Sequence, residues 1–174
     1  MLNEETIARH YIMKLLIILR HGKAEQNTMD KDDYDRQLTN RGRNNSTDMG
    51  KFILDKIGSP DLILSSSANR AFETAQLAAD SIGYPTDKIE ADQNLYFAPS
   101  NWILNVISKL DDNLNSCLFI GHNPGLTELI NSLGVDLDNL PTASSVCFEF
   151  NVDSWIDIAP NRANFKWFKK AREL

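Results

Sequence analysis

The chain has 174 residues, of which 42% are hydrophobic and 24% charged, and its formal net charge is −6 at neutral pH. This length and apolar content suit one globular domain with a sizeable core. The negative charge argues against nucleic acid or an anionic membrane as the main partner, because both carry charge of the same sign. Any phosphate-binding site must therefore be a local concentration of positive charge on an acidic protein.

Residues 1–12 precede the first apolar run, so we expect an N-terminal extension followed by a single domain over 13–174. The extension lacks the apolar centre of a signal peptide. No apolar run reaches the roughly 18 residues of a membrane-spanning helix. Cys117 and Cys147 lie far apart in strand-like apolar runs, which favours two reduced core cysteines. A cytoplasmic location is the expectation that follows.

The most informative stretch is 15–22, where five apolar residues run directly into Arg20, His21 and Gly22. The apolar run predicts a buried strand. In an open α/β sheet, ligands bind beyond the carboxyl ends of the strands, so Arg20 and His21 would face a site. Gly22 permits a sharp turn or a close approach of its backbone to a ligand. For one strand alone, a solvent-exposed arginine and histidine would be an equally good interpretation.

A polar, aspartate-rich segment over 23–37 predicts a long surface loop. Thr39 then suits the N-cap of a helix, because apolar residues recur at helical spacing as far as Ile57. Gly58 is typical of the residue that follows a helix end. This part of the chain therefore predicts a loop and one long helix.

A second strand and helix follow. Residues 62–64 predict a short buried strand that ends in three serines, and 68–82 predict an alanine-rich helix closed by Gly83. Arg70 falls in the first turn of that helix, where the helix dipole prefers anions. A bound anion nearby would explain a cation at this place.

The next segment predicts little structure before a third helix. Residues 84–92 indicate a loop with at most a short strand, and Pro99 is typical of a helix start. The apolar residues that follow recur at helical spacing, which predicts a buried stripe. Its members are Trp102, Ile103, Val106, Ile107 and Leu110.

A third apolar strand is predicted over 117–120, and it leads into His122. Asn123 and Pro124 suit the N-cap and first position of another helix, which Gly134 ends. His122 therefore lies, like the histidine after the first strand, between a strand end and the next segment.

The last part of the chain reads as two antiparallel strands, over 144–150 and 163–168, because apolar and polar residues alternate there. Strands that alternate with helices elsewhere predict a parallel sheet covered by helices. The expected fold is thus a three-layer α/β/α sandwich with a mostly parallel central sheet and an antiparallel edge.

Three motifs stand at strand ends in the order Arg20-His21-Gly22, Ser66-Ser67-Ala68-Asn69-Arg70-Ala71 with Thr74 one turn on, and Gly121-His122-Asn123-Pro124-Gly125. With them, roughly residues 14–168 resemble the histidine phosphatase superfamily, which has the phosphoglycerate mutase-like fold. Because the chain is short and lacks a large inserted cap, it is most similar to the phosphohistidine phosphatases of the SixA type.

Phosphoryl transfer requires an in-line nucleophile and donors around the equatorial phosphate oxygens. The resemblance implies that His21 is the nucleophile, through a covalent phosphohistidine that water hydrolyses, and that Arg20, Arg70 and His122 hold the phosphoryl group. His122 would work best protonated, which an adjacent phosphate dianion favours. No cofactor or metal is expected, since two histidines without clustered carboxylate or cysteine ligands make a poor zinc site.

Other residues of the motifs have simpler interpretations. Asn27 lies where some superfamily members place a phosphate-contacting asparagine, and a solvated loop residue is the alternative. Thr39 falls in a stretch similar to the family's Leu-Thr-x-x-Gly segment, although a helix N-cap explains it fully. Ser66 and Ser67 favour a turn, and contact with phosphate is the alternative for them.

The sequence departs from the superfamily in one respect. Members that cleave phosphate esters usually have a carboxylate general acid where this chain has Asn94, with Asp92 two residues away. An alkoxide leaving group needs a proton, whereas phosphohistidine leaves as a neutral imidazole once its ring is protonated. The hypothesis is therefore a phosphatase acting on phosphohistidine in a partner protein.

Two alternatives remain open. The first is a small-molecule phosphomonoesterase or mutase of the same superfamily, acting on a small phosphate ester with Asp92 or Glu90 as the acid. The second is a non-catalytic phosphate-binding module. The presence of both histidines and both arginines argues against the second, because a binding module has no need of a nucleophile.

Overall fold

A computed structural model describes residues 13–174, and the predicted extension over 1–12 lies outside the described residues. Six strands form one sheet in the order β3-β2-β4-β1-β5-β6. Their bounds are β1 Lys14–Arg20, β2 Leu62–Ser66, β3 Glu90–Asp92, β4 Ser116–Gly121, β5 Ser145–Phe150 and β6 Ala163–Lys169. The first four run parallel, while β5 and β6 are each antiparallel to the preceding neighbour. The mostly parallel sheet with an antiparallel edge is confirmed.

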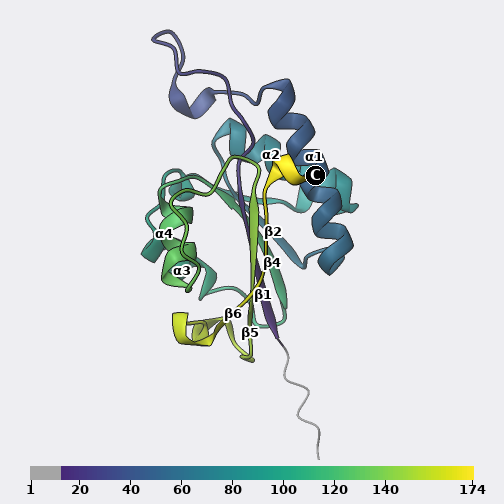
Figure 1. Ribbon diagram of the computed structural model, residues 1–174, viewed down its shortest axis with the longest axis vertical. Coiled ribbons are helices and arrows are strands. Elements are labelled where there is room, and N and C mark those ends of the chain that lie inside the picture. The colour runs from purple at the N-terminus through teal and green to yellow at the C-terminus, as the bar shows by residue number, and fades with distance from the viewer. Residues whose placement is uncertain (1–12) are drawn as a thin grey trace, which may run out of the picture.

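Four helices cover the two faces of this sheet, α1 and α2 on one and α3 and α4 on the other (Figure 1). Their bounds are α1 Asn40–Ile57, α2 Asn69–Ile82, α3 Ser100–Ile107 and α4 Gly125–Ser132. Alternate residues of β1 supply the two cores, since Ile17 and Leu19 pack toward α1 and α2 whereas Leu16 and Ile18 pack toward α3 and α4. The three-layer sandwich is therefore confirmed. No helix within 13–174 is long and apolar enough to span a bilayer.

The boundaries of α1 agree with the prediction. The Thr39 hydroxyl accepts a hydrogen bond from the Gly42 amide at 3.1 Å, and Gly58 ends the helix with a φ of 76°. A Cβ on Gly42 would lie 2.1 Å from the carbonyl oxygen of Lys23. The glycine inside the helix is thus required for close contact between the helix and the segment that follows β1.

The predicted apolar stripe of α3 is only partly correct. Ile103 and Ile107 are buried, but Trp102 is 44% exposed. Helical periodicity places Trp102 beside the buried stripe, and α3 packs only one narrow face against its neighbours. Its ring lies on the outer side, among the residues of a surface hollow that also includes Phe97.

The predicted start of α4 is wrong by one position, because Asn123 does not cap it. The helix begins at Gly125, and Pro124 has the N-cap place without a side-chain hydrogen bond. The Asn123 amide group donates instead to Asn139 Oδ1 and to the Leu140 carbonyl, at 2.8 and 2.9 Å. Its side chain therefore ties the end of β4 to the loop before β5.

Candidate active site

The three sequence motifs meet at the carboxyl ends of the parallel strands because β2, β4 and β1 are adjacent in the sheet. His21 follows β1, Arg70 lies in the first turn of α2, and His122 follows β4. The ring centres of His21 and His122 are 5.1 Å apart, and Arg70 Nε lies 3.3 Å from His21 Nε2. The exposed fractions of His21, Arg70 and His122 are 7%, 1% and 2%. The fold thus assembles the predicted cluster in a buried place.

The His21 ring presents a lone pair to this cluster. Its Nδ1 donates to the carbonyl of Gly22 at 2.7 Å, which leaves Nε2 to accept from Arg70 Nε. Burial, then His122 and the charges of Arg70 and Arg20, lower the pKa of His21 well below its usual range. His21 is consequently a neutral imidazole whose Nε2 is available as a nucleophile.

Close packing fixes the backbone next to His21. The amide of Gly22 donates to Thr74 Oγ1 at 2.9 Å, and that hydroxyl donates in turn to the carbonyl of Arg70 at 2.7 Å. A Cβ on Gly22 would lie 2.7 Å from both Gly42 O and Ser46 Oγ. The glycine of the first motif therefore lets the nucleophile's loop pack directly against α1, while Thr74 joins it to α2.

His122 and Arg20 each have a buried nitrogen without a partner among residues 13–174. These atoms are His122 Nδ1 and Arg20 Nε. Another nitrogen of each side chain is bonded, His122 Nε2 to Ser66 Oγ at 2.8 Å and Arg20 Nη1 to the carbonyl of Leu140 at 2.7 Å. Buried polar atoms without partners are costly and uncommon, and an oxyanion in the cluster would satisfy both atoms.

The expectation of a protonated His122 concerns the state with a phosphate dianion beside it. Burial, followed by the positive charge of Arg70, lowers the pKa of His122 to about 3. The ring is therefore neutral here at ordinary pH. A bound phosphate dianion would have to supply the negative charge that favours the protonated form.

Asp33 is a site residue that the sequence interpretation missed. It belongs to the segment between β1 and α1, which rises beyond the end of the sheet (Figure 1). Arg70 donates to the Asp33 carbonyl at 2.6 Å and to its Oδ2 at 3.0 Å, and Tyr96 donates to the same Oδ2 at 2.5 Å. Arg36 binds the other carboxylate oxygen at 2.6 Å. Asp33 thus accepts the hydrogen bonds of Arg70 that a phosphoryl group would otherwise accept.

These contacts determine the charge of Asp33. Although partial burial acts in the opposite direction, the hydrogen bonds from Tyr96 and Arg36 and the charge of Arg70 hold its pKa well below the usual range. Asp33 is accordingly a carboxylate at any ordinary pH. It has no proton to give to a leaving group.

Two aromatic rings form a wall beside His122. The ring centres of Tyr96 and Phe97 lie 5.4 and 5.1 Å from that of His122. They follow the segment in which a carboxylate acid was sought, where Asn94 is exposed and Asp92 caps a turn by accepting from the Asn94 amide at 2.8 Å. This segment therefore brings aromatic surface to the cluster.

The structure does not bring the predicted phosphate contact Asn27 into the cluster. Asn27 is exposed on the loop after β1, and no side-chain hydrogen bond joins it to another of the residues 13–174. Its part in phosphate binding remains a prediction from the resemblance.

The family model for the histidine phosphatase superfamily, branch 1, matches residues 16–96, which carry Arg20, His21 and Arg70. This match covers a little under half of the chain, and over it the chain is similar to the histidine phosphatase superfamily. His122 lies beyond the matched segment, and the sheet brings it to the other three residues.

Individual proteins are similar to this chain as well. An uncharacterized chloroplastic protein of Arabidopsis thaliana is 28% identical over 159 residues, which cover 83% of this chain and 70% of that protein. A protein of Nakamurella multipartitia assigned as the phosphohistidine phosphatase SixA is 19% identical, with a TM-score of 0.79, over 91% of this chain and 96% of that one. The protein histidine phosphatase SixA in complex with tungstate is 20% identical, with a TM-score of 0.71, over 91% and 98%. At these identities the two structures establish the common fold.

Proposed function

We propose that this protein is a phosphatase of the histidine phosphatase type, which removes the phosphoryl group from phosphohistidine in a partner protein without a metal ion or other cofactor. His21 Nε2 attacks phosphorus and the P–N bond of the substrate breaks, so that a covalent phosphohistidine forms on His21. The substrate ring, protonated on its other nitrogen, leaves as neutral imidazole. Water then attacks the enzyme's phosphorus, the P–Nε2 bond breaks, and the phosphate that leaves contains the water oxygen and both of its protons, while His21 returns to the neutral imidazole.

Donors around the nucleophile support the phosphoryl-transfer part of this proposal. Arg20, Arg70 and His122 would bind the equatorial oxygens, and two of them have a buried nitrogen that lacks a partner among the described residues. No group of three or more His, Cys, Asp or Glu side chains within 13–174 is arranged to hold a metal ion. The arginines thus supply the positive charge that the transition state requires.

The observation that carries the choice of substrate is the state of the acids near His21. Asp33 is held ionised by its partners, and the pKa of Tyr96 is raised by burial and by Asp33, so its proton stays in the hydrogen bond to that carboxylate. Neither group is suited to protonate an alkoxide. Phosphohistidine needs no such acid because its ring brings the proton.

Brief mixing with a phosphohistidine peptide, followed by intact-mass measurement, tests this function. We expect an acid-labile gain of one phosphoryl group, absent in His21→Ala and retained in His10→Ala, which removes the third histidine of the chain. A phosphoserine peptide is the matched ester and should label the enzyme far less. Activity should also persist in excess chelator.

Two results would contradict the proposal. Labelling and hydrolysis of the phosphoserine peptide at the rate of the phosphohistidine peptide would favour a general phosphomonoesterase. Binding of both peptides without labelling or hydrolysis would favour a non-catalytic module.

A further inference from the structure

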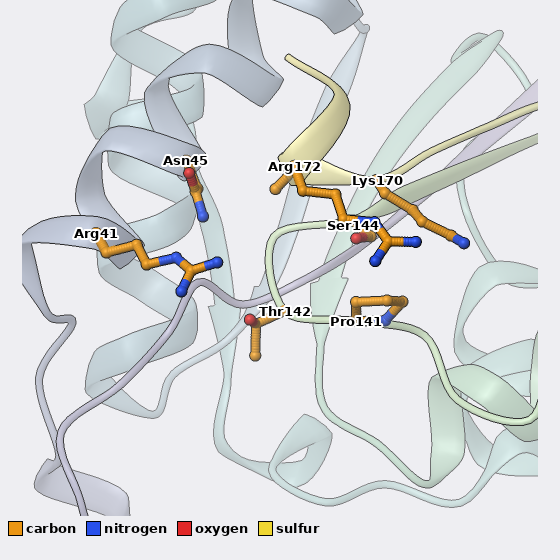
Figure 2. Close-up of a pocket in the computed structure, with 8 residues that line it drawn as sticks. Arg41, Asn45, Pro141, Thr142, Ser144, Lys170 and Arg172 are labelled. Atoms are coloured by element: carbon orange, nitrogen blue, oxygen red, sulfur yellow. The ribbon is translucent and has the colours of Figure 1, made fainter.

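A second pocket, with a volume of about 180 Å³, lies apart from the catalytic cluster. Its walls are the first turns of α1, the loop before β5, and a short 3-10 turn, η6 (Ala171–Glu173), at the end of the described chain. Figure 2 shows Arg41 and Asn45 reaching into it from α1, with Arg172 on the opposite side and Thr142 between them. Ser144 and Lys170 complete the polar lining.

The charged groups of this pocket are all positive. Arg41, Lys170 and Arg172 line it, no carboxylate does, and none of the three forms an ion pair within 13–174. The nearby Glu173 accepts the Lys170 backbone amide at 3.0 Å, in the cap of η6. Three unpaired cations on a protein of net charge −6 form a local positive field that selects anions.

Ser144 belongs to the wall of this pocket. Its side chain is fully buried, and its Oγ has no hydrogen-bond partner among residues 13–174. Native proteins pair almost all buried hydroxyls. The Ser144 hydroxyl is covered by the pocket wall, while the two guanidinium groups provide forks that match an oxyanion.

We propose that this pocket binds one oxyanion group of the phosphate class, either as free phosphate or as a second anionic group of a substrate. Its volume is below the roughly 300 Å³ at which pockets for larger organic ligands begin, so it suits a single such group. The site goes beyond the proposed function and does not depend on it.

The pocket wall is connected to the catalytic strand. The amide of Ala143 donates to the carbonyls of Arg20 and His21 at 3.1 and 3.0 Å, and the amide of Arg20 donates to the carbonyl of Ser144 at 3.1 Å. An anion bound in the pocket would therefore sit against a segment that is hydrogen-bonded to the nucleophile's own backbone.

Titration with inorganic phosphate at constant ionic strength, followed by calorimetry and backbone NMR, tests the site without turnover. We expect two phosphates on the wild-type protein and one on Arg70→Gln, with shifts at Asn45 and Thr142. In the Arg70→Gln background, the pair Arg41→Gln and Arg172→Gln should weaken the remaining affinity at least tenfold.

The matched control is Lys109→Gln, which removes an exposed cation beyond the end of α3. It should leave both phosphates bound. Loss of all phosphate binding in Arg70→Gln would overturn the proposal, as would an affinity in that background that the pocket variants do not change. A protein that binds two phosphates but hydrolyses no phosphohistidine would retain this site and lose only the proposed function.

Steady-state kinetics separates the two sources of the anion. Phosphoramidate carries one anionic group, whereas a phosphohistidine peptide with acidic flanks carries more. A larger rise in KM for the acidic peptide than for phosphoramidate in the double variant would assign the pocket to the substrate. Equal effects, with phosphate binding retained in the wild-type protein, would assign it to free phosphate.

Discussion

The catalytic cluster and the basic pocket both gather arginines at the same end of the sheet, but a carboxylate pairs only with Arg70 of the catalytic cluster. Arg70 is 1% exposed and has Asp33 as its counterion, whereas Arg41 and Arg172 are exposed and have none within 13–174. A buried guanidinium requires a partner because desolvation of the charge is costly. An exposed one is hydrated and requires none. An arginine therefore points to an anion-binding site only after the carboxylates already paired with it have been taken into account.

Substitution of Arg70 in the catalytic cluster should have the largest effect on activity. Arg70→Gln removes a guanidinium beside the nucleophile and should lower kcat by about 10²- to 10³-fold, the effect of losing a transition-state donor. Arg70→Lys should rescue only part of this, since an ammonium lacks the planar fork. Initial rates with phosphoramidate measure the effect, with Arg162→Gln as the control at an exposed arginine just before β6. Equal rates in the two glutamine variants would remove Arg70 from the mechanism.

The two buried histidines of the catalytic cluster should make the free energy of unfolding depend on pH, and the basic pocket contains no histidine. Above pH 6.5 His21 and His122 are neutral in both the folded and the unfolded chain. Below it the unfolded histidines take up protons, with a pKa of about 6.5, while the folded His122 stays neutral down to about 3 and His21 likewise has a lowered pKa. The free energy of unfolding should thus fall as the pH drops, by about 2 kcal/mol between pH 7 and pH 5 for His122, and the lowered pKa of His21 acts in the same direction.

Denaturant unfolding of the wild-type protein and His122→Gln at these two pH values measures the effect. The variant should lose about 2 kcal/mol less than the wild type, because one of the two buried histidines is gone. Asp33 does not obscure this window, since an unfolded aspartate titrates near 3.9. The same pH dependence in both proteins would show that His122 takes up its proton in the folded state.

Those parts of the fold and the site that follow from hydrophobic periodicity and from the order of the elements along the chain could be predicted from the sequence. Apolar runs predict β1, β2 and β4, and the parallel order of these strands brings His21, Arg70 and His122 together. The prediction that Trp102 is buried was wrong, because the periodicity of a helix of about two turns does not show how much of its surface packs against the rest of the protein.

The missing parts of both sites depend on contacts between distant segments. Asp33 is one of several aspartates in a polar loop, and no local pattern distinguishes it before the loop folds against Arg70 and Tyr96. Ser144 reads as the first residue of a strand, and its lack of a partner is visible only in three dimensions. The neutral state of His122 likewise follows from its burial, which the sequence does not specify.

Asp33→Asn tests whether the Asp33 carboxylate makes Arg70 less available to an anion than the arginines of the basic pocket. Asparagine keeps the size of the side chain but loses the charge, so Arg70 would be held less firmly and an incoming oxyanion would have less to displace. Affinity for tungstate, measured by calorimetry, should rise by up to about tenfold, which is 1.4 kcal/mol. The free energy of unfolding should fall by about 1–3 kcal/mol, because Arg70 and Tyr96 lose a charged acceptor.

Asp30→Asn is the matched control, since Asp30 is exposed in the same loop. It removes the same charge at a distance from the guanidinium and should change tungstate affinity little. Weaker tungstate binding in Asp33→Asn than in Asp30→Asn would reverse the interpretation, because Asp33 would then position Arg70 for the phosphoryl group instead of competing with it. Tighter binding would show that the protein keeps its catalytic arginine buried with a carboxylate that the substrate must replace.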